Sequence, residues 1–354
     1  MNTTELLHIR LYNQLLTTHE LKETQEIVAW MGAMQAQMLD LARWAIGTRL
    51  ENKTVKDIDE ALNTGKVIRT HILRPTWHFV SAEDIHWMYD LSNARLKPVY
   101  QSYAKQSGAD IAFINRTIPL LEKALLDGKH LTKTEISEVL QTQSITLDTT
   151  HLNMLIHFAE MEGIVVNGRL NGNKQTYTLL GEWAPRKHTL SKEEALERLA
   201  RRFFTSHAPA TINDFAWWSG LSLTECKQAI ELIKGDFVSE TINSRTFWMK
   251  KDLKVPPTSE HSALLLPPFD EFVVSYKDRS ELIADHHYSK VMTKNGIFSP
   301  TLMLNGEIIG SWKKTIKKGV PQIELSYFEK TPKHIQQLFE PERKRLERFY
   351  AYSI

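Results

Sequence analysis

Three stretches of the chain repeat one pattern, in which apolar residues at helical spacing give way to two short runs with a period of two. This change of period predicts helices followed by a β-ribbon, a combination typical of a winged helix. The expected ribbons comprise residues 66–73 with 76–80, 164–167 with 175–180, and 237–241 with 246–250. The copies are spaced too unevenly for a solenoid, so the pattern predicts three tandem winged-helix units.

The chain becomes strand-rich after residue 256. Asn305-Gly306 predicts a tight hairpin turn, as do residues 171–173 and 317–319. A final amphipathic helix is expected over 332–352. We therefore predict an α+β protein whose domains comprise residues 1–112 (first winged helix with connecting helices), 113–185 (second), 186–256 (third) and 257–354 (β-rich part with a terminal helix).

The charge balance limits how the chain can bind a partner. Its 354 residues include 44 Lys plus Arg and 42 Asp plus Glu, which argues against a histone-like binder but leaves room for a local basic groove. Cys226 is the single cysteine, so an internal disulfide and paired-cysteine metal motifs are excluded. The sequence has neither a signal-peptide pattern nor a long apolar run, and we expect a cytoplasmic protein without membrane segments.

Two glutamines, Gln35 and Gln37, lie in a region that otherwise has helical spacing. On one continuous helix their side chains would diverge by about 200°. On an extended segment they would share a face, because side chains there repeat every two residues. Gly32 precedes them, and we expect it to end one helix, with an extended joint before the next helix and with both amides facing one spot.

Winged helices favour nucleic acid as the partner, because the fold places a helix in a groove, but they also serve as protein-interaction modules. Four lysines crowd one expected hairpin in the C-terminal part, namely Lys313, Lys314, Lys317 and Lys318. They suit a phosphate backbone, but lysines also protect exposed strand edges. The residues alone leave both alternatives open.

Several motifs together resemble the winged-helix DNA-binding-domain family that contains the AlkZ-like DNA glycosylases. They are Met34-Gln-Ala-Gln, Ile68-Arg-Thr-His-Ile-Leu-Arg-Pro-Thr-Trp-His-Phe-Val, Leu265-Leu-Pro-Pro-Phe-Asp-Glu-Phe, Tyr276-Lys-Asp-Arg-Ser and Asn305-Gly-Glu-Ile-Ile-Gly-Ser-Trp-Lys-Lys. The resemblance covers essentially the whole chain in the family's order, and the combination is more specific than any single motif.

The resemblance implies tandem winged helices that form a concave DNA-binding surface, and excision of alkylated bases, in some members from interstrand crosslinks. The family's active site carries a glutamine–any–glutamine motif, which Gln35 and Gln37 match. It also implies site or DNA contacts for Arg69, Arg74, Thr76 and His78 on the first ribbon. Asp270 and Arg279 match a later motif, where an ion pair or a turn-fixing role is at least as well founded as catalysis.

Amide side chains suit this chemistry. A purine alkylated at a ring nitrogen is cationic and leaves readily, so little general-acid catalysis is needed. The amide oxygens of Gln35 and Gln37 would hold the attacking water and face the developing positive charge. A neutral amide does not deprotonate water as a carboxylate does, so we expect weak or no activity on undamaged bases.

The chain departs from the family pattern at two places. Met38-Leu39 replace an acidic residue and a proline that often follow the glutamine motif, and the nearest acid is displaced to Asp40. Pro75 replaces a common glycine and should stiffen the ribbon corner.

We expect no cofactor. We also expect no metal, because His286 and His287 are adjacent and their side chains should point apart. The expected partner is damaged double-stranded DNA, bound by a monomeric, nucleoid-associated protein of bacterial type. The rival hypotheses are a non-catalytic winged-helix transcriptional regulator and a protein-binding module.

Overall fold

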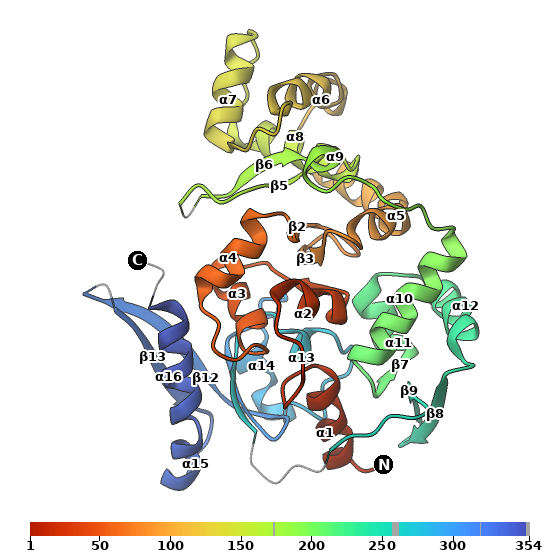
Figure 1. The fold of residues 1–354 in the computed structure, drawn as a ribbon, viewed down its shortest axis with the longest axis vertical. Coiled ribbons are helices and arrows are strands. Elements are labelled where there is room, and N and C mark those ends of the chain that lie inside the picture. The colour runs from red at the N-terminus through yellow and green to blue at the C-terminus, as the bar shows by residue number, and fades with distance from the viewer. Residues whose placement is uncertain (173, 257–261, 319, 352–354) are drawn as a thin grey trace. The chain divides into compact units, whose positions relative to one another are not determined.

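The computed structural model describes residues 1–172, 174–256, 262–318 and 320–351. The chain forms two compact units, one comprising Met1–Ile58 with Leu196–Ile354 and the other Asp59–Ala195. Helices α4 (Val55–Asn63) and α10 (Lys192–Ser206) carry the chain from one unit into the other. Both units are mixed α/β with small antiparallel sheets (Figure 1). Among the described residues, no helix is both long and apolar enough to span a membrane.

The smaller unit, Asp59–Ala195, contains the first two expected ribbons, and the structure confirms both. Strands β2 (Val67–His71) and β3 (Trp77–Ser81) pair antiparallel, with Thr70 opposite His78. Strands β5 (Val165–Asn167) and β6 (Thr176–Leu179) form the second ribbon. The expected turn at 171–173 includes residue 173, which lies outside the described residues.

Four longer helices build the core of this smaller unit. They are α5 (Ile85–Gln106), α6 (Ile111–Leu125), α7 (Lys133–Thr142) and α8 (Thr149–Met161). A short helix, α9 (Leu180–Trp183), follows β6. Helix α7 begins with a capping box, in which the Thr132 hydroxyl and the Glu135 carboxylate each accept a backbone N–H across the first turn.

The larger unit begins with α1 (Thr3–Asn13), α2 (Thr24–Met31), the short strand β1 (Ala33–Gln35) and α3 (Leu39–Gly47). Its second segment contains α11 (Ile212–Ser219), α12 (Leu223–Ile233) and the third expected ribbon, β8 (Phe237–Ile242) with β9 (Arg245–Lys250), which the structure also confirms. The aromatic rings of Phe203, Phe215 and Trp218 pack together in its core.

Two very short strands join the ribbons, and the sequence did not indicate them. Strand β4 (Leu131–Thr132) pairs with β6, and β7 (Ala210–Thr211) pairs with β9. The resulting sheets have the matching orders β4-β6-β5 and β7-β9-β8. A two-residue strand is too short to show a period of two, so only its pairing partner reveals it.

The C-terminal part forms a four-stranded antiparallel sheet in the order β10-β11-β12-β13. Its strands are β10 (Ala263–Leu266), β11 (Thr301–Leu304), β12 (Glu307–Lys317) and β13 (Val320–Tyr327). The short helices α13 (Glu271–Val274), η1 (Asp285–His287) and α14 (Tyr288–Val291) lie between β10 and β11 in the chain. The turn at Asn305-Gly306 is confirmed, with φ of 51° and 92° at these residues, whereas residue 319 of the second turn lies outside the described residues.

The prediction of one terminal helix is wrong. The segment forms two helices, α15 (Lys333–Leu338) and α16 (Glu340–Tyr350), which are separated at the buried Phe339. Pro341 lies in the first turn of α16, where its missing N–H costs nothing, but it could not donate within a continuous helix. Helix α16 lies along the β12–β13 hairpin (Figure 1).

Candidate functional site

A sharp backbone change at Gly32 shapes the glutamine segment in the larger unit. Gly32 ends α2 with φ of +82°, a conformation that other residues rarely adopt. The Trp218 ring lies directly beneath it, 3.4 Å from where a Cβ would stand. Strand β1 follows at once, and α3 begins at Leu39. The expected break between two helices is therefore confirmed, and residues 33–38 form a strap between α2 and α3.

The two glutamines of the strap differ in exposure. Gln35 is the last residue of β1 and is only 6% exposed, whereas Gln37 lies in the bend after the strand and is exposed to solvent. Met34 and Ala36 are fully buried and fix the strap to the core. The extended conformation thus includes Gln35 but stops before Gln37, so the period-two argument does not by itself give both amides one direction.

A buried carboxylate, Glu271, lies behind the strap and holds its backbone. The N–H of Gln35 donates to Oε1 of Glu271 at 2.6 Å. Oε2 of Glu271 accepts from the indole N–H of Trp218 at 3.0 Å and from the Ser275 hydroxyl at 2.5 Å. His207 Nε2 lies 3.6 Å from the same oxygen. Both oxygens of Glu271 are therefore occupied by donors.

The donors keep Glu271 ionised in spite of its complete burial. Burial by itself would raise the pKa of this carboxyl, but the contacts from His207, Ser275 and Gln35 outweigh burial and lower the pKa to about 2. Burial also lowers the pKa of His207. A carboxylate with so low a pKa is a weak base, so Glu271 is suited to positioning the strap and not to activating water.

Asp270, the neighbouring carboxylate, makes a second buried network. It accepts two hydrogen bonds from Arg49, at 2.8 and 2.9 Å, and both side chains are fully buried. Its Oδ1 also accepts the N–H of Phe272 and so caps α13. The Gln14 side chain connects the Arg49 guanidinium to the Tyr276 hydroxyl. Asp270 thus forms an ion pair and also fixes a turn, the two structural roles considered for it.

Arg279 is buried separately from this pair. Its guanidinium donates to the carbonyls of Val273 and Val274 and lies over the rings of Trp217 and Phe298. Burial lowers the pKa of Arg279, although Tyr288, Asp214 and Asp278 act in the opposite direction. The structure places Arg279 as a brace for the segment after α13.

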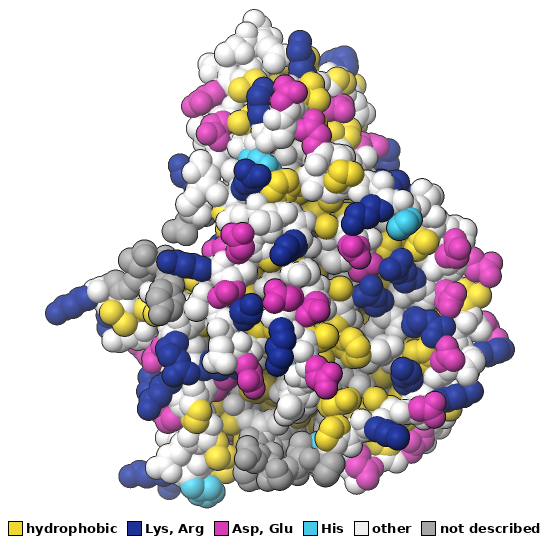
Figure 2. Space-filling model, viewed as in Figure 1, with side chains coloured by type: hydrophobic (Ala, Val, Ile, Leu, Met, Phe, Trp, Pro, Cys, Tyr) yellow, Lys and Arg dark blue, Asp and Glu magenta, His cyan; other side chains and the backbone are white. Residues whose placement is uncertain are grey.

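The lysine hairpin, β12–β13, is fixed to the helix that follows the strap. Nζ of Lys314 lies 2.7 Å from Oδ2 of Asp40 and 3.7 Å above the centre of the Tyr350 ring. Lys313, Lys317 and Lys318 are exposed, and Figure 2 shows basic side chains along the end of this hairpin. The displaced acidic residue of the motif therefore anchors one of the four lysines and leaves the other three facing solvent.

The predicted residues of the first ribbon belong to the smaller unit, Asp59–Ala195. Arg69 is buried, donates to Asn167 and Gln175 at 3.2 and 2.7 Å, and stacks on Trp77. His78 is fully buried, and its Nδ1 lies 2.8 Å from the carbonyl oxygen of Thr76. Arg74 and Thr76 are partly exposed in the turn between the strands. Arg69 and His78 therefore have structural contacts in this unit. The turn residues are more exposed, although the Thr76 hydroxyl oxygen itself is buried.

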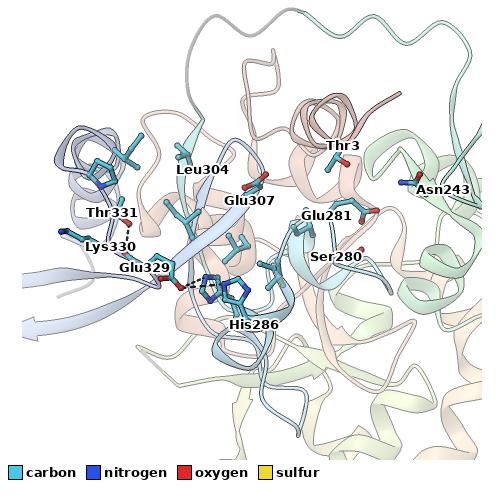
Figure 3. Close-up of a pocket in the computed structure, with 18 of the residues that line it drawn as sticks. Thr3, Asn243, Ser280, Glu281, His286, Leu304, Glu307, Glu329, Lys330 and Thr331 are labelled. Carbon is cyan, nitrogen blue, oxygen red and sulfur yellow. Dashed lines mark hydrogen bonds and ion pairs between the residues drawn. The ribbon is translucent and has the colours of Figure 1, made fainter.

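The expectation that His286 and His287 point apart is wrong. They lie on a 3-10 turn, their ring centres are 3.9 Å apart, and both Nε2 atoms approach Oε1 of Glu329, at 3.9 and 3.5 Å. This tight turn does not alternate its side chains as a strand would. The group borders a pocket of about 740 Å³, in which His286 faces Glu329 (Figure 3). His286 and Glu329 are both 70% exposed.

Sequence reasoning missed the residues that hold the strap, namely Glu271, Trp218, His207 and Arg49. The sequence did contain a signal for the burial of Asp270 and Glu271. These two adjacent acids stand in the otherwise apolar segment Leu265-Leu-Pro-Pro-Phe-Asp-Glu-Phe-Val. Acids in such a context are expected to be buried and to require donors. The identity of those donors, more than 200 residues away for Gln35 and Arg49, requires the fold.

The comparisons with known proteins agree with this fold. The model of the family described as "DNA glycosylase AlkZ-like" matches residues 28–349. The chain therefore belongs to the AlkZ-like DNA glycosylases, a class of DNA repair enzymes.

Among solved structures, the Streptomyces sahachiroi DNA glycosylase AlkZ is similar, with a TM-score of 0.78 and 18% sequence identity, over 100% of this chain and 97% of that one. At this identity the likeness establishes a shared fold. The comparison with curated proteins gives no match.

Proposed function

We propose that the protein is a monofunctional DNA glycosylase that hydrolyses the N-glycosidic bond of alkylated, cationic purines. The observation that carries the proposal is the state of the acids around the strap. Glu271 and Asp270 are buried and occupied by donors, and Asp40 is paired with Lys314. The polar groups that the strap itself offers are the amides of Gln35 and Gln37. Such a site suits a base that leaves without strong acid or base catalysis.

The reaction assigns a distinct task to each part of the strap. The C1′–N bond breaks, its electron pair neutralises the cationic base, and the sugar acquires oxocarbenium character. The amide oxygens of Gln37 and Gln35 hold a water below C1′ and face the positive charge. The water oxygen bonds to C1′ and its proton passes to solvent. Gln37 is the exposed partner, while Glu271 fixes the backbone at Gln35.

DNA binding is proposed for the winged-helix units and the lysine hairpin. The matching sheet orders β4-β6-β5 and β7-β9-β8, each with helices between the first strand and the ribbon, support two such units, and β2–β3 with its preceding helices supports the third. We propose that Lys313, Lys317 and Lys318 contact phosphates, together with Arg74 and Thr76. We propose duplex DNA bound by a monomer in the cytoplasm, with interstrand crosslinks as a further substrate class.

The decisive experiment incubates the chain with a DNA duplex that carries one 7-methylguanine. Released base is measured by chromatography, and abasic sites by alkaline strand cleavage. The Gln37→Ala variant should lose about 100-fold in excision rate while it binds the same duplex normally, since loss of one preorganised dipole costs about this much. Gln336→Ala on α15 is the matched control and should excise normally, because Gln336 donates to Thr331 away from the strap.

The same assay separates this proposal from a DNA-binding regulator. A regulator would bind undamaged duplex tightly and release no base above background. That result with the unaltered chain refutes the glycosylase proposal, whereas full activity in Gln37→Ala refutes the role given to this residue alone.

A further inference from the structure

A buried polar cluster in the smaller unit lies within an otherwise apolar core. His71 is the last residue of β2, and His157 and Glu160 are three residues apart on one face of α8. His71 and Glu160 are buried, whereas His157 is partly exposed. The ligand-forming atoms of the three side chains all lie within 4.8 Å of one another. Two histidines and one carboxylate therefore converge from a strand and a helix.

The contacts of this cluster are incomplete. Nδ1 of His71 lies 2.8 Å from Oε2 of Glu160. Within the described part of the chain, the other carboxylate oxygen, Oε1 of Glu160, is buried without a hydrogen-bond partner, and so are Nδ1 of His157 and the Tyr100 hydroxyl. The Tyr100 ring lies 5.5 Å from that of His157 and 5.8 Å from that of His71. Glu160, His157 and the adjacent Tyr100 thus each have a buried polar atom without a partner among the described residues.

Among the described residues, the two cations nearest this cluster donate hydrogen bonds to other side chains. The Lys133 ammonium is half-buried and donates to Asn153 at 2.5 Å, and Arg69 donates to Asn167 and Gln175. The side chain of His157 is partly exposed, but its Nδ1 is buried and has no hydrogen-bond partner among the described residues. A buried carboxylate oxygen without a donor is costly unless a cation or a proton joins it.

We propose that His71, His157 and Glu160 bind a divalent transition-metal ion, with Zn²⁺ as the best-suited ion. Two imidazoles and one carboxylate are ligands that Zn²⁺ takes readily, and its fourth position would face the Tyr100 hydroxyl or a water. Soft thiolate chemistry is absent from this group, and Mg²⁺ or Ca²⁺ would prefer an all-oxygen site. The partly exposed His157 provides the route of entry.

Such an ion would join elements that are far apart in the chain. It would link the end of β2 to α8, and the His71 ring in turn stacks on Trp77 of β3 at 3.9 Å. The metal would therefore hold the β2–β3 ribbon on the helical core of its unit. This inference concerns the architecture of the unit and does not depend on the glycosylase proposal.

The test uses the tag-free full-length chain freed of metal by chelator and dialysis. Co²⁺ serves as the probe, because its visible absorption reports tetrahedral nitrogen and oxygen ligands, and Zn²⁺ should displace it. We expect about one Co²⁺ per chain, and a rise in Tm with Zn²⁺. His157→Gln and Glu160→Gln should each weaken binding by about 100-fold or more, since even residues that merely orient ligands cost 10- to 100-fold.

Two controls make the result specific. His286→Gln alters the His286–His287–Glu329 group, which also has metal-binding spacing, and should leave the tight Co²⁺ site intact. His151→Gln alters another histidine of α8, paired with Asp148, and should have no effect.

Circular dichroism in metal-free buffer checks that each variant is folded, and His157→Gln is informative even if Glu160→Gln fails to fold. No Co²⁺ binding by the unaltered chain, or equal binding by the folded His157→Gln variant, overturns the proposal. The proposal is also overturned if His286→Gln loses Co²⁺ binding while His157→Gln and Glu160→Gln retain it.

Discussion

Two buried glutamates, one in each unit, differ in how many hydrogen-bond donors surround their carboxylates. Glu271 lies behind the glutamine strap, and its two oxygens receive hydrogen bonds from a backbone N–H, an indole and a hydroxyl. Glu160 is equally inaccessible, but it has one partner at hydrogen-bond distance, His71, and Oε1 has none among the described residues. Both acids are on helices, and the difference between them lies in the number of donors.

The number of donors around Glu271 and Glu160 distinguishes an acid that holds the fold from an acid that can bind a ligand. A carboxylate whose two oxygens both accept hydrogen bonds gains little from a further ligand, and its neighbours become rigid instead. At Glu271 the neighbour that gains rigidity is the backbone of Gln35. A buried carboxylate with one oxygen lacking a donor carries a desolvation cost that a bound cation can offset. We therefore assign a positioning role to Glu271 and a ligand role to Glu160.

The largest expected effect comes from removing the partner of Asp270, the other buried acid near the strap, whose two oxygens both accept hydrogen bonds. Arg49→Met would leave Asp270 buried and charged without its guanidinium partner. We expect the free energy of unfolding to fall by about 3–5 kcal/mol, as when one partner of a buried pair is removed. Urea denaturation followed by tryptophan fluorescence measures this loss.

Arg343→Met is the matched control for Arg49→Met. Arg343 is a part-exposed arginine of α16, with ion pairs to Glu340 and Glu347 at 2.7 and 2.8 Å. Its loss should cost less than about 1 kcal/mol, because surface pairs contribute little. Equal costs for the two variants would contradict the view that donor saturation in the interior stabilises the strap.

A smaller effect is expected when Glu271 itself is neutralised. Glu271→Gln retains the shape but places an amide NH₂ against the donors from Gln35, Trp218 or Ser275. We expect a loss of about 1–3 kcal/mol in unfolding free energy, together with slower base excision, because the strap backbone loses its acceptor. Glu307→Gln, an exposed change in β12, should alter neither quantity.

The pH dependence of stability provides an independent test of Glu271. Its pKa is lowered from 4.5 to about 2 on folding, so the native state favours the ionised form. The resulting stabilisation is complete above pH 4.5 and is lost as the pH falls from there towards 2. The slope of unfolding free energy against pH in this window should be smaller in Glu271→Gln than in the unaltered chain. Identical slopes would show that other acids dominate.

Sequence patterns predicted the elements of this fold better than their connections. The three ribbons and the Asn305-Gly306 turn were predicted correctly, because period and turn chemistry are local properties. The strands β4 and β7 were missed, since two residues show no period. The division of the terminal helix at Phe339 was also missed, although Pro341 was a local warning.

Of the candidate site, the sequence predicted the glutamine segment and the helix break before it, but not the contacts that hold the segment. Gly32 and the two glutamines were visible in the sequence, and the expected helix break was confirmed. The burial of Gln35 and the exposure of Gln37 were not visible, because they depend on where β1 stops. The contact between Gln35 and Glu271 spans 236 residues, and no local pattern encodes it.

The smallest expected effect is that of Glu160→Gln in metal-free buffer, and it tests the comparison most directly. The glutamine oxygen can still accept from Nδ1 of His71, and the oxygen that is replaced by NH₂ had no donor facing it among the described residues. We therefore expect a change in unfolding free energy within about 1 kcal/mol, less than for Glu271→Gln. With Zn²⁺ present the gap between Glu160→Gln and the unaltered chain should widen, because the ion stabilises only the chain that binds it. Equal losses for Glu160→Gln and Glu271→Gln without metal would mean that donor number does not distinguish the two acids.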